Sequence, residues 1–123
     1  MAVHSIGVDI TEIERINDLI NRYGNRFLKR VFTDKEIEYC NKKATAASSY
    51  AARFATKEAV FKATGLGLNQ GMSWRDIEVL NDQNGKPFIK LSGITKEKLN
   101  SKKIHLSLSH SKGHAISMVV VDE

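Results

Sequence analysis

Two acidic residues stand where carboxylates are uncommon, and their positions suggest metal chemistry. Glu58 falls in a segment whose positions 51, 54, 55, 58, 61 and 62 recur at helical spacing and are mostly small or aromatic. An unpaired carboxylate taken out of water is costly, so we expect an inward-facing Glu58 with a cation or a metal ion beside it. Lys62, one helical turn later, is a candidate cation.

The second acidic residue is Asp9. Ile6, Val8 and Ile10 alternate as one face of a predicted strand, which places Gly7 and Asp9 on the other face. Because Gly7 has no side chain, another group can approach the backbone beside Asp9. Two carboxylates from separate elements are a typical way to hold Mg²⁺, which takes few protein oxygens and keeps water and phosphate as further ligands.

A structural explanation of both carboxylates is also open. Asp9 can end a strand or begin a helix, and Glu58 can pair with Lys62, since ion pairs commonly explain displaced charges. Residue spacing alone favours these structural roles over a metal site.

Polar residues near the end of the chain suggest phosphate binding. In the predicted strand 104–109, His105, Ser107 and Ser109 share one face, and His110 begins the following turn. Hydroxyl, imidazole and turn amides suit phosphate recognition, and a solvent-facing polar strand is the alternative. A Ser-His hydrolase dyad is disfavoured, because neighbouring strand side chains point to opposite faces and no Gly-x-Ser-x-Gly motif is present.

The net charge of +5 indicates an anionic partner. Thr11 and Glu14 predict a capping box for a helix that ends near Gly24. Basic residues gather on this helix and just after it: Arg15, Arg22, Arg26, Lys29 and Arg30. A solvated face or nucleic-acid binding would explain them too, although no RNP-like aromatic pattern, zinc knuckle or helix-turn-helix signature accompanies the charge.

The remaining pattern predicts one α+β domain over residues 1–123, with an antiparallel sheet and a long helix packed on it. Thr33 and Glu36 predict a second capping box, and Asn84-Gly85 predicts a hairpin. The expected helices cover about 33–43, 46–64 and 95–100, and the later strands cover 77–80, 87–91, 104–109 and 115–121. Gly65, Gly67 and Gly71 end the long helix and form a connection.

Composition is that of a small cytoplasmic protein. The chain has 123 residues with 41% hydrophobic content, enough for one core. No apolar stretch has the length of a signal peptide or a membrane span, so we expect no membrane association. The single cysteine, Cys40, has no internal disulfide partner and no zinc-ligand spacing.

Three blocks of this sequence resemble the holo-acyl-carrier-protein synthase family. They are IGVDITEIERI at residues 6–16, RFATKEAVFKATGLG at residues 53–67 and HLSLSH at residues 105–110. The resemblance spans residues 6–121, in that family's order and spacing. It implies the 4′-phosphopantetheinyl transferase fold of the bacterial trimeric type, with active sites between neighbouring subunits.

The resemblance also implies a reaction: 4′-phosphopantetheine passes from coenzyme A to a serine of apo-acyl carrier protein, for fatty acid biosynthesis, leaving adenosine 3′,5′-bisphosphate. Asp9 and Glu58 would hold Mg²⁺, Glu58 would act as the base through a metal-bound water, and Lys62 would neutralise phosphate charge. Implied coenzyme A contacts are Arg53, Lys57, Gly65, Ser109 and His110, and implied carrier-protein contacts are Arg15, Arg22 and Arg26. Leu66 stands where many members have Thr, so a hydroxyl contact to the nucleotide would be lost.

Overall fold

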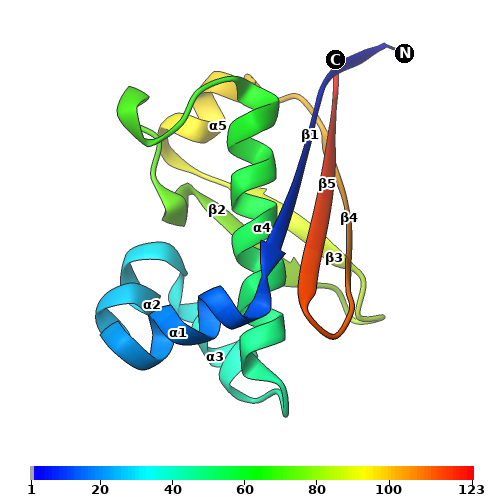
Figure 1. The fold of residues 1–123 in the computed structure, drawn as a ribbon. Helices are drawn as coiled ribbons and strands as arrows, with labels where there is room; N and C mark the ends of the chain where they lie inside the picture. The colour runs from blue at the N-terminus through cyan, green and yellow to red at the C-terminus, as the bar shows by residue number, and fades with distance from the viewer. Residues whose placement is uncertain (1) are drawn as a thin grey trace.

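The computed structural model describes residues 2–123, and its order of elements confirms the predicted α+β class (Figure 1). The elements are β1 (Val3–Glu12), α1 (Ile13–Tyr23), α2 (Asn25–Val31), α3 (Asp34–Asn41), α4 (Ala46–Thr64), the 3-10 turns η1 (Leu68–Gln70) and η2 (Trp74–Asp76), β2 (Ile77–Asn81), β3 (Pro87–Leu91), α5 (Gly93–Leu99), β4 (Ile104–His110) and β5 (His114–Asp122). No helix in this described range combines the length and the apolarity needed to cross a membrane.

The strands form two separate antiparallel sheets. One has the order β1-β5-β4, so the first strand of the chain pairs with the last, and the other is the predicted β2–β3 hairpin. In the larger sheet Asp9 lies opposite Ser117, and Thr11 lies opposite Ala115. Ala115, Ser117, Val119 and Val121 of β5 are buried, because this face of the sheet packs on α4.

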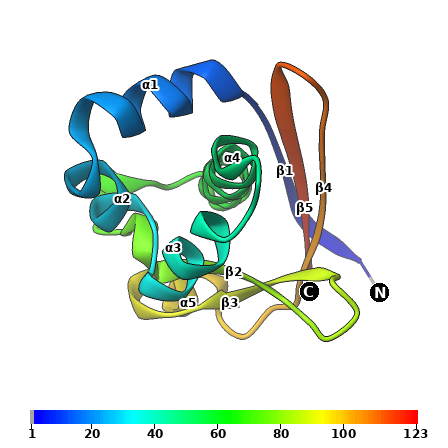
Figure 2. The ribbon, with the colours of Figure 1, turned by 90° about the horizontal axis from the view of Figure 1, so that it is seen from below.

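Helix α4 is enclosed by the rest of the fold. Figure 2 looks along its axis and shows the larger sheet on one side, with α1, α2, α3 and the β2–β3 hairpin around the others. From Tyr50 to Phe61 every residue is buried except Glu58, which is half-buried. The predicted apolar stripe with an inward-facing Glu58 is therefore wrong: α4 is buried around its circumference, and Glu58 and the exposed Lys62 mark where it reaches solvent.

The charged pair that is buried is Lys57 with Glu36. Lys57 Nζ lies 2.8 Å from Glu36 Oε1, both side chains are 0% exposed, and the ammonium also donates to the carbonyls of Trp74 and Ile77. Burial lowers the pKa of Lys57, while the negative charge of Glu36 opposes that shift. The pair ties α3 and α4 to the turn before β2.

The two predicted capping boxes have different outcomes. Thr33 and Glu36 form the expected box at the start of α3. The box predicted for Thr11 and Glu14 is wrong, because Thr11 still belongs to β1 and α1 begins after Glu12 without a side-chain cap. The Thr11 hydroxyl instead donates to the Asp9 carboxylate.

Gly7 allows β1 to lie directly on α4. A Cβ at this position would overlap the carbonyl oxygen of Ala59 and would come within 2.9 Å of the amide nitrogen of Ala63. The small side chains of Ala59 and Ala63 form the facing surface of the helix. The backbones of β1 and α4 are therefore in direct contact here, and this contact sets the position of Asp9 along the axis of α4.

We expect Gly7→Ala to lower the free energy of unfolding by about 1–3 kcal/mol or more, because neither β1 nor α4 can move without disturbing the sheet. Urea denaturation measures the change. Gly113→Ala is the matched control, since nothing lies within 4 Å of a Cβ placed there. Equal stability of the two variants would show that the close approach at Gly7 is not required.

Candidate functional site

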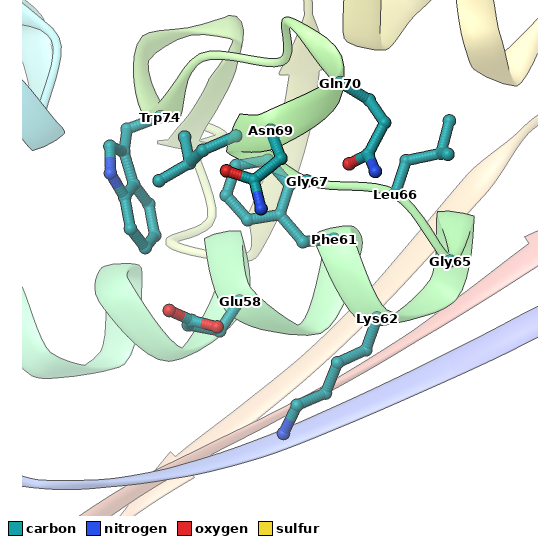
Figure 3. A pocket seen from close by; sticks show the side chains of 10 residues that line it. Glu58, Phe61, Lys62, Gly65, Leu66, Gly67, Asn69, Gln70 and Trp74 are labelled. Carbon is teal, nitrogen blue, oxygen red and sulfur yellow. The ribbon is translucent and has the colours of Figure 1, made fainter.

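The structure gathers Glu58, Lys62 and Gly65 around one cavity of about 550 Å³. Glu58 and Lys62 project from α4, Gly65 ends that helix in a left-handed conformation, and the following loop forms the opposite wall (Figure 3). A helix end with a cation and a carboxylate beside an open cavity suits a charged substrate.

Asp9 joins this site from β1. Lys62 Nζ lies 3.0 Å from Asp9 Oδ1 and also donates to the carbonyl of Val8 at 3.1 Å. Figure 3 shows the Lys62 side chain reaching from the helix toward the neighbouring strand. The pairing of Lys62 with Glu58, one of the two explanations left open by the sequence, is replaced by this pairing with Asp9. The other oxygen, Oδ2, accepts from Thr11 at 2.7 Å.

Electrostatics links the two carboxylates. Burial is the main cause that raises the pKa of Glu58, and the negative charge of Asp9 raises it further. The positive charges of Lys62 and Arg15 oppose the shift. A carboxylate with a raised pKa binds a proton more readily, which is a property of general bases.

The donor set fits a hard divalent cation with few protein ligands. Asp9 and Glu58 supply carboxylate oxygens, and their mutual repulsion is relieved by a positive charge between them. Within residues 2–123 no group of three or more His, Cys, Asp or Glu side chains could hold a metal ion. A metal at this site would thus take its remaining ligands from water or substrate, as Mg²⁺ commonly does.

Aromatic side chains form one wall of the cavity, which the residue patterns did not predict. The Trp74 ring lies 5.0 Å from the Phe54 ring and 5.1 Å from the Phe61 ring, measured between centroids. Trp74, Phe61, Asn69 and Gln70 all line the cavity, and none was predicted as a site residue. The single tryptophan was the one available signal.

A second cavity, of about 310 Å³, contains two other predicted residues, Arg53 and His110. Arg53 lies five residues before Glu58, which turns it well away around the helix. Its guanidinium donates to Ser49 and Asn81 at 3.2 and 2.8 Å, and its Nε has no hydrogen-bond partner within residues 2–123. His110 is the last residue of β4, opposite Ala115, so its predicted place at the start of the turn is wrong by one residue.

Two further predicted residues lie apart from both cavities. Ser109 is exposed on the outer face of the larger sheet, with His105 and Ser107, as the alternation predicted. Lys57 was expected to contact coenzyme A phosphates, but its ammonium is fully buried against Glu36. That expectation is corrected: in this structure the ammonium of Lys57 forms a buried ion pair and is not exposed to bind a phosphate.

The basic residues expected to dock a partner lie on two consecutive helices near the start of the chain. Arg15 and Arg22 belong to α1, and Arg26 belongs to α2; all three are exposed. The Arg15 guanidinium lies 5.6 Å from the centroid of the Phe54 ring, and its positive charge acts to lower the pKa of Glu58. Arg15 therefore lies near the carboxylate pair, and Arg22 and Arg26 follow it in α1 and α2.

A cation, a carboxylate pair and a helix end that faces an open cavity define a site for anionic group transfer. Residues 5–119 match the family described as the 4′-phosphopantetheinyl transferase superfamily, and the chain belongs to it. It is 49% identical over 115 residues to the holo-[acyl-carrier-protein] synthase of Protochlamydia amoebophila, with 94% of each chain covered. The assignment to the holo-acyl-carrier-protein synthase family made from the sequence is confirmed.

Solved structures of this family share the fold. Holo-[acyl-carrier-protein] synthase of Helicobacter pylori in complex with coenzyme A gives a TM-score of 0.85 at 37% identity, covering 95% of this chain and 99% of that one. The enzyme of Bacillus anthracis in complex with CoA (3′,5′-ADP) gives a TM-score of 0.81 at 36% identity, covering 97% and 96%.

Proposed function

We propose that this protein is a transferase that moves 4′-phosphopantetheine from coenzyme A to a serine of apo-acyl carrier protein. The observation that carries the proposal is that Glu58 and Lys62 line the cavity and Lys62 pairs with Asp9, in a chain of this family. The relatives named above are holo-[acyl-carrier-protein] synthases, and two solved relatives contain coenzyme A or its nucleotide part. Adenosine 3′,5′-bisphosphate is the second product, and fatty acid biosynthesis is the use expected for holo-carrier protein.

We assign the metal to Asp9 and Glu58. Mg²⁺ bound there would neutralise charge on the pyrophosphate of coenzyme A. Lys62, freed to turn toward a phosphate, would stabilise the negative charge that moves between donor and acceptor. Glu58 is the proposed base for the serine hydroxyl, supported by its raised pKa. Gly65 lines the cavity without a side chain, which leaves room for a phosphate to approach the end of α4.

The predicted coenzyme A contacts that lie apart from Glu58 need a neighbouring copy to reach the carboxylate pair. We propose a homotrimer in which Arg53, Ser109 and His110 of one copy complete the site formed by Asp9, Glu58 and Lys62 of the next. Two observations support this: Arg53 and His110 line a cavity apart from Glu58, and β1 and β5 expose apolar side chains on the outer face of the larger sheet. Ile6 and Ile10 on that face are each 64% exposed, which favours burial against another copy.

Carrier-protein docking is assigned to Arg15, Arg22 and Arg26. Acyl carrier protein is acidic, the three guanidinium groups are exposed, and Arg15 lies near the carboxylate pair where the serine must arrive. We assign no nucleic-acid or membrane partner, and a cytoplasmic location stays a prediction.

The first test is transfer itself. Incubation with apo-acyl carrier protein, coenzyme A and Mg²⁺ should add the mass of phosphopantetheine to the carrier, detected by intact mass spectrometry. Asp9→Ala and Glu58→Ala should each reduce the rate by about 100-fold or more, because a metal ligand contributes several kcal/mol of charge stabilisation in the transition state. Glu97→Ala removes an exposed carboxylate of α5 and should retain the wild-type rate. Transfer by either site variant at the wild-type rate would refute the metal assignment.

The second test addresses the shared site. Glu58→Ala and His110→Ala subunits, co-expressed with different tags and purified as mixed oligomers, should recover transfer at low coenzyme A concentration. A mixed trimer contains a site with Glu58 from one variant and His110 from the other, so one intact site forms. Activity no greater than the sum of the separate variants would exclude sites built from two copies.

The third test addresses docking. Arg15→Glu and Arg22→Glu should each reduce kcat/KM for carrier protein by about five- to thirtyfold, corresponding to about 1–2 kcal/mol, with a small effect on the KM for coenzyme A. Added salt should weaken the wild-type reaction, since screening reduces attraction between exposed charges. Lys98→Glu makes the same charge change on α5 and is the control. Docking lies elsewhere if all three variants behave alike.

A further inference from the structure

We propose that Thr11 is a positioning residue that holds the Asp9 carboxylate in place for cation binding. The inference rests on the metal site proposed above. It concerns a residue that the sequence pattern had assigned to a helix cap, and it gives this threonine a part in the site without any contact to substrate.

The position of Thr11 makes its hydroxyl a fixed donor. It lies two residues after Asp9 in β1, so both side chains point to the same face of the sheet, toward α4. Thr11 is 2% exposed, and its Oγ1 donates to Asp9 Oδ2 at 2.7 Å. A short hydrogen bond to a carboxylate is among the stronger hydrogen bonds in proteins.

The two oxygens of Asp9 are held in unequal ways. Oδ2 is bound by the buried Thr11, whereas Oδ1 is bound by Lys62, whose side chain is 55% exposed. A long exposed lysine exchanges partners easily, while a buried threonine on a paired strand does not. A cation can therefore replace Lys62 at Oδ1 while Thr11 keeps the carboxylate from rotating.

Among residues 2–123, Asp9 is the only side chain with which the Thr11 hydroxyl forms a hydrogen bond. Ala115, which faces it across the ladder in β5, has no polar side-chain atom. Valine has the same shape, favours strands and would fill this buried position without a hydroxyl that needs a partner. The hydroxyl of Thr11 is thus explained by Asp9.

The test uses Mn²⁺ as a probe of the site. Electron paramagnetic resonance measures the affinity of the purified full chain for Mn²⁺. Thr11→Val should weaken Mn²⁺ binding by about tenfold or more, the usual cost of removing a group that orients a metal ligand. Thr11→Ser keeps the hydroxyl and should stay within about threefold of the wild type. Thr95→Val is the matched control, because it removes another threonine–aspartate hydrogen bond, 3.0 Å long, between Thr95 and Asp76.

Thermal unfolding of each variant accompanies the binding measurement, and Thr11→Ala replaces Thr11→Val if the latter does not fold. Wild-type affinity in the variant without the hydroxyl overturns the proposal, and so does an equal loss in Thr11→Ser or Thr95→Val. If the wild type itself binds no Mn²⁺, both the proposed metal site and the role of Thr11 fall. If the wild type binds and Thr11→Val binds equally well, only the role of Thr11 falls.

Discussion

The site depends on the contact between the backbones of β1 and α4. With a glycine at position 7 and alanines at positions 59 and 63, the strand lies on the helix with no side chain between them. The positions of Asp9 and Lys62 follow from that contact and from the periodicity of a strand and a helix. Asp9 is two strand residues beyond Gly7, on the same face, and Lys62 is one residue before Ala63. Their ion pair at 3.0 Å is thus a consequence of main-chain packing.

Helix α4 is buried along most of its surface, yet its sequence contains charged residues, and burying a charge without a partner is unfavourable. The structure resolves this conflict in two ways. Lys57 is buried and finds Glu36 together with two carbonyl groups, so its charge is satisfied internally. Glu58 and Lys62 lie where the surrounding elements leave a gap, and that gap is the cavity. The opening in the packing and the two proposed site residues lie on one strip of the helix.

Local patterns in the sequence predicted the elements well and their burial less well. The alternation in β1, the Thr33–Glu36 cap and the Asn84-Gly85 hairpin are set by neighbouring residues, and each is found in the structure. The burial of α4 on nearly every side could not be predicted, because segments distant in the sequence cover the helix. Its many small residues also gave no clear division into a polar and an apolar face. For the same reason Lys57 was expected at the surface. Thr11 was mistaken for a cap because a capping box and a strand end have the same residue types, and only tertiary pairing separates them.

The pairing of the first strand with the last has a consequence for how the protein is made. Asp9 is synthesised early, yet the hydrogen-bond partner of β1 in the larger sheet is β5, at the opposite end of the chain. A nascent chain that has not released His114–Asp122 from the ribosome has α4 for β1 to pack on, but it lacks the strand to which β1 is hydrogen-bonded. Joining segments so far apart is slow because a long loop must close. The proposed site therefore depends on a long-range strand pairing, and we expect β1 to take its final place late in folding.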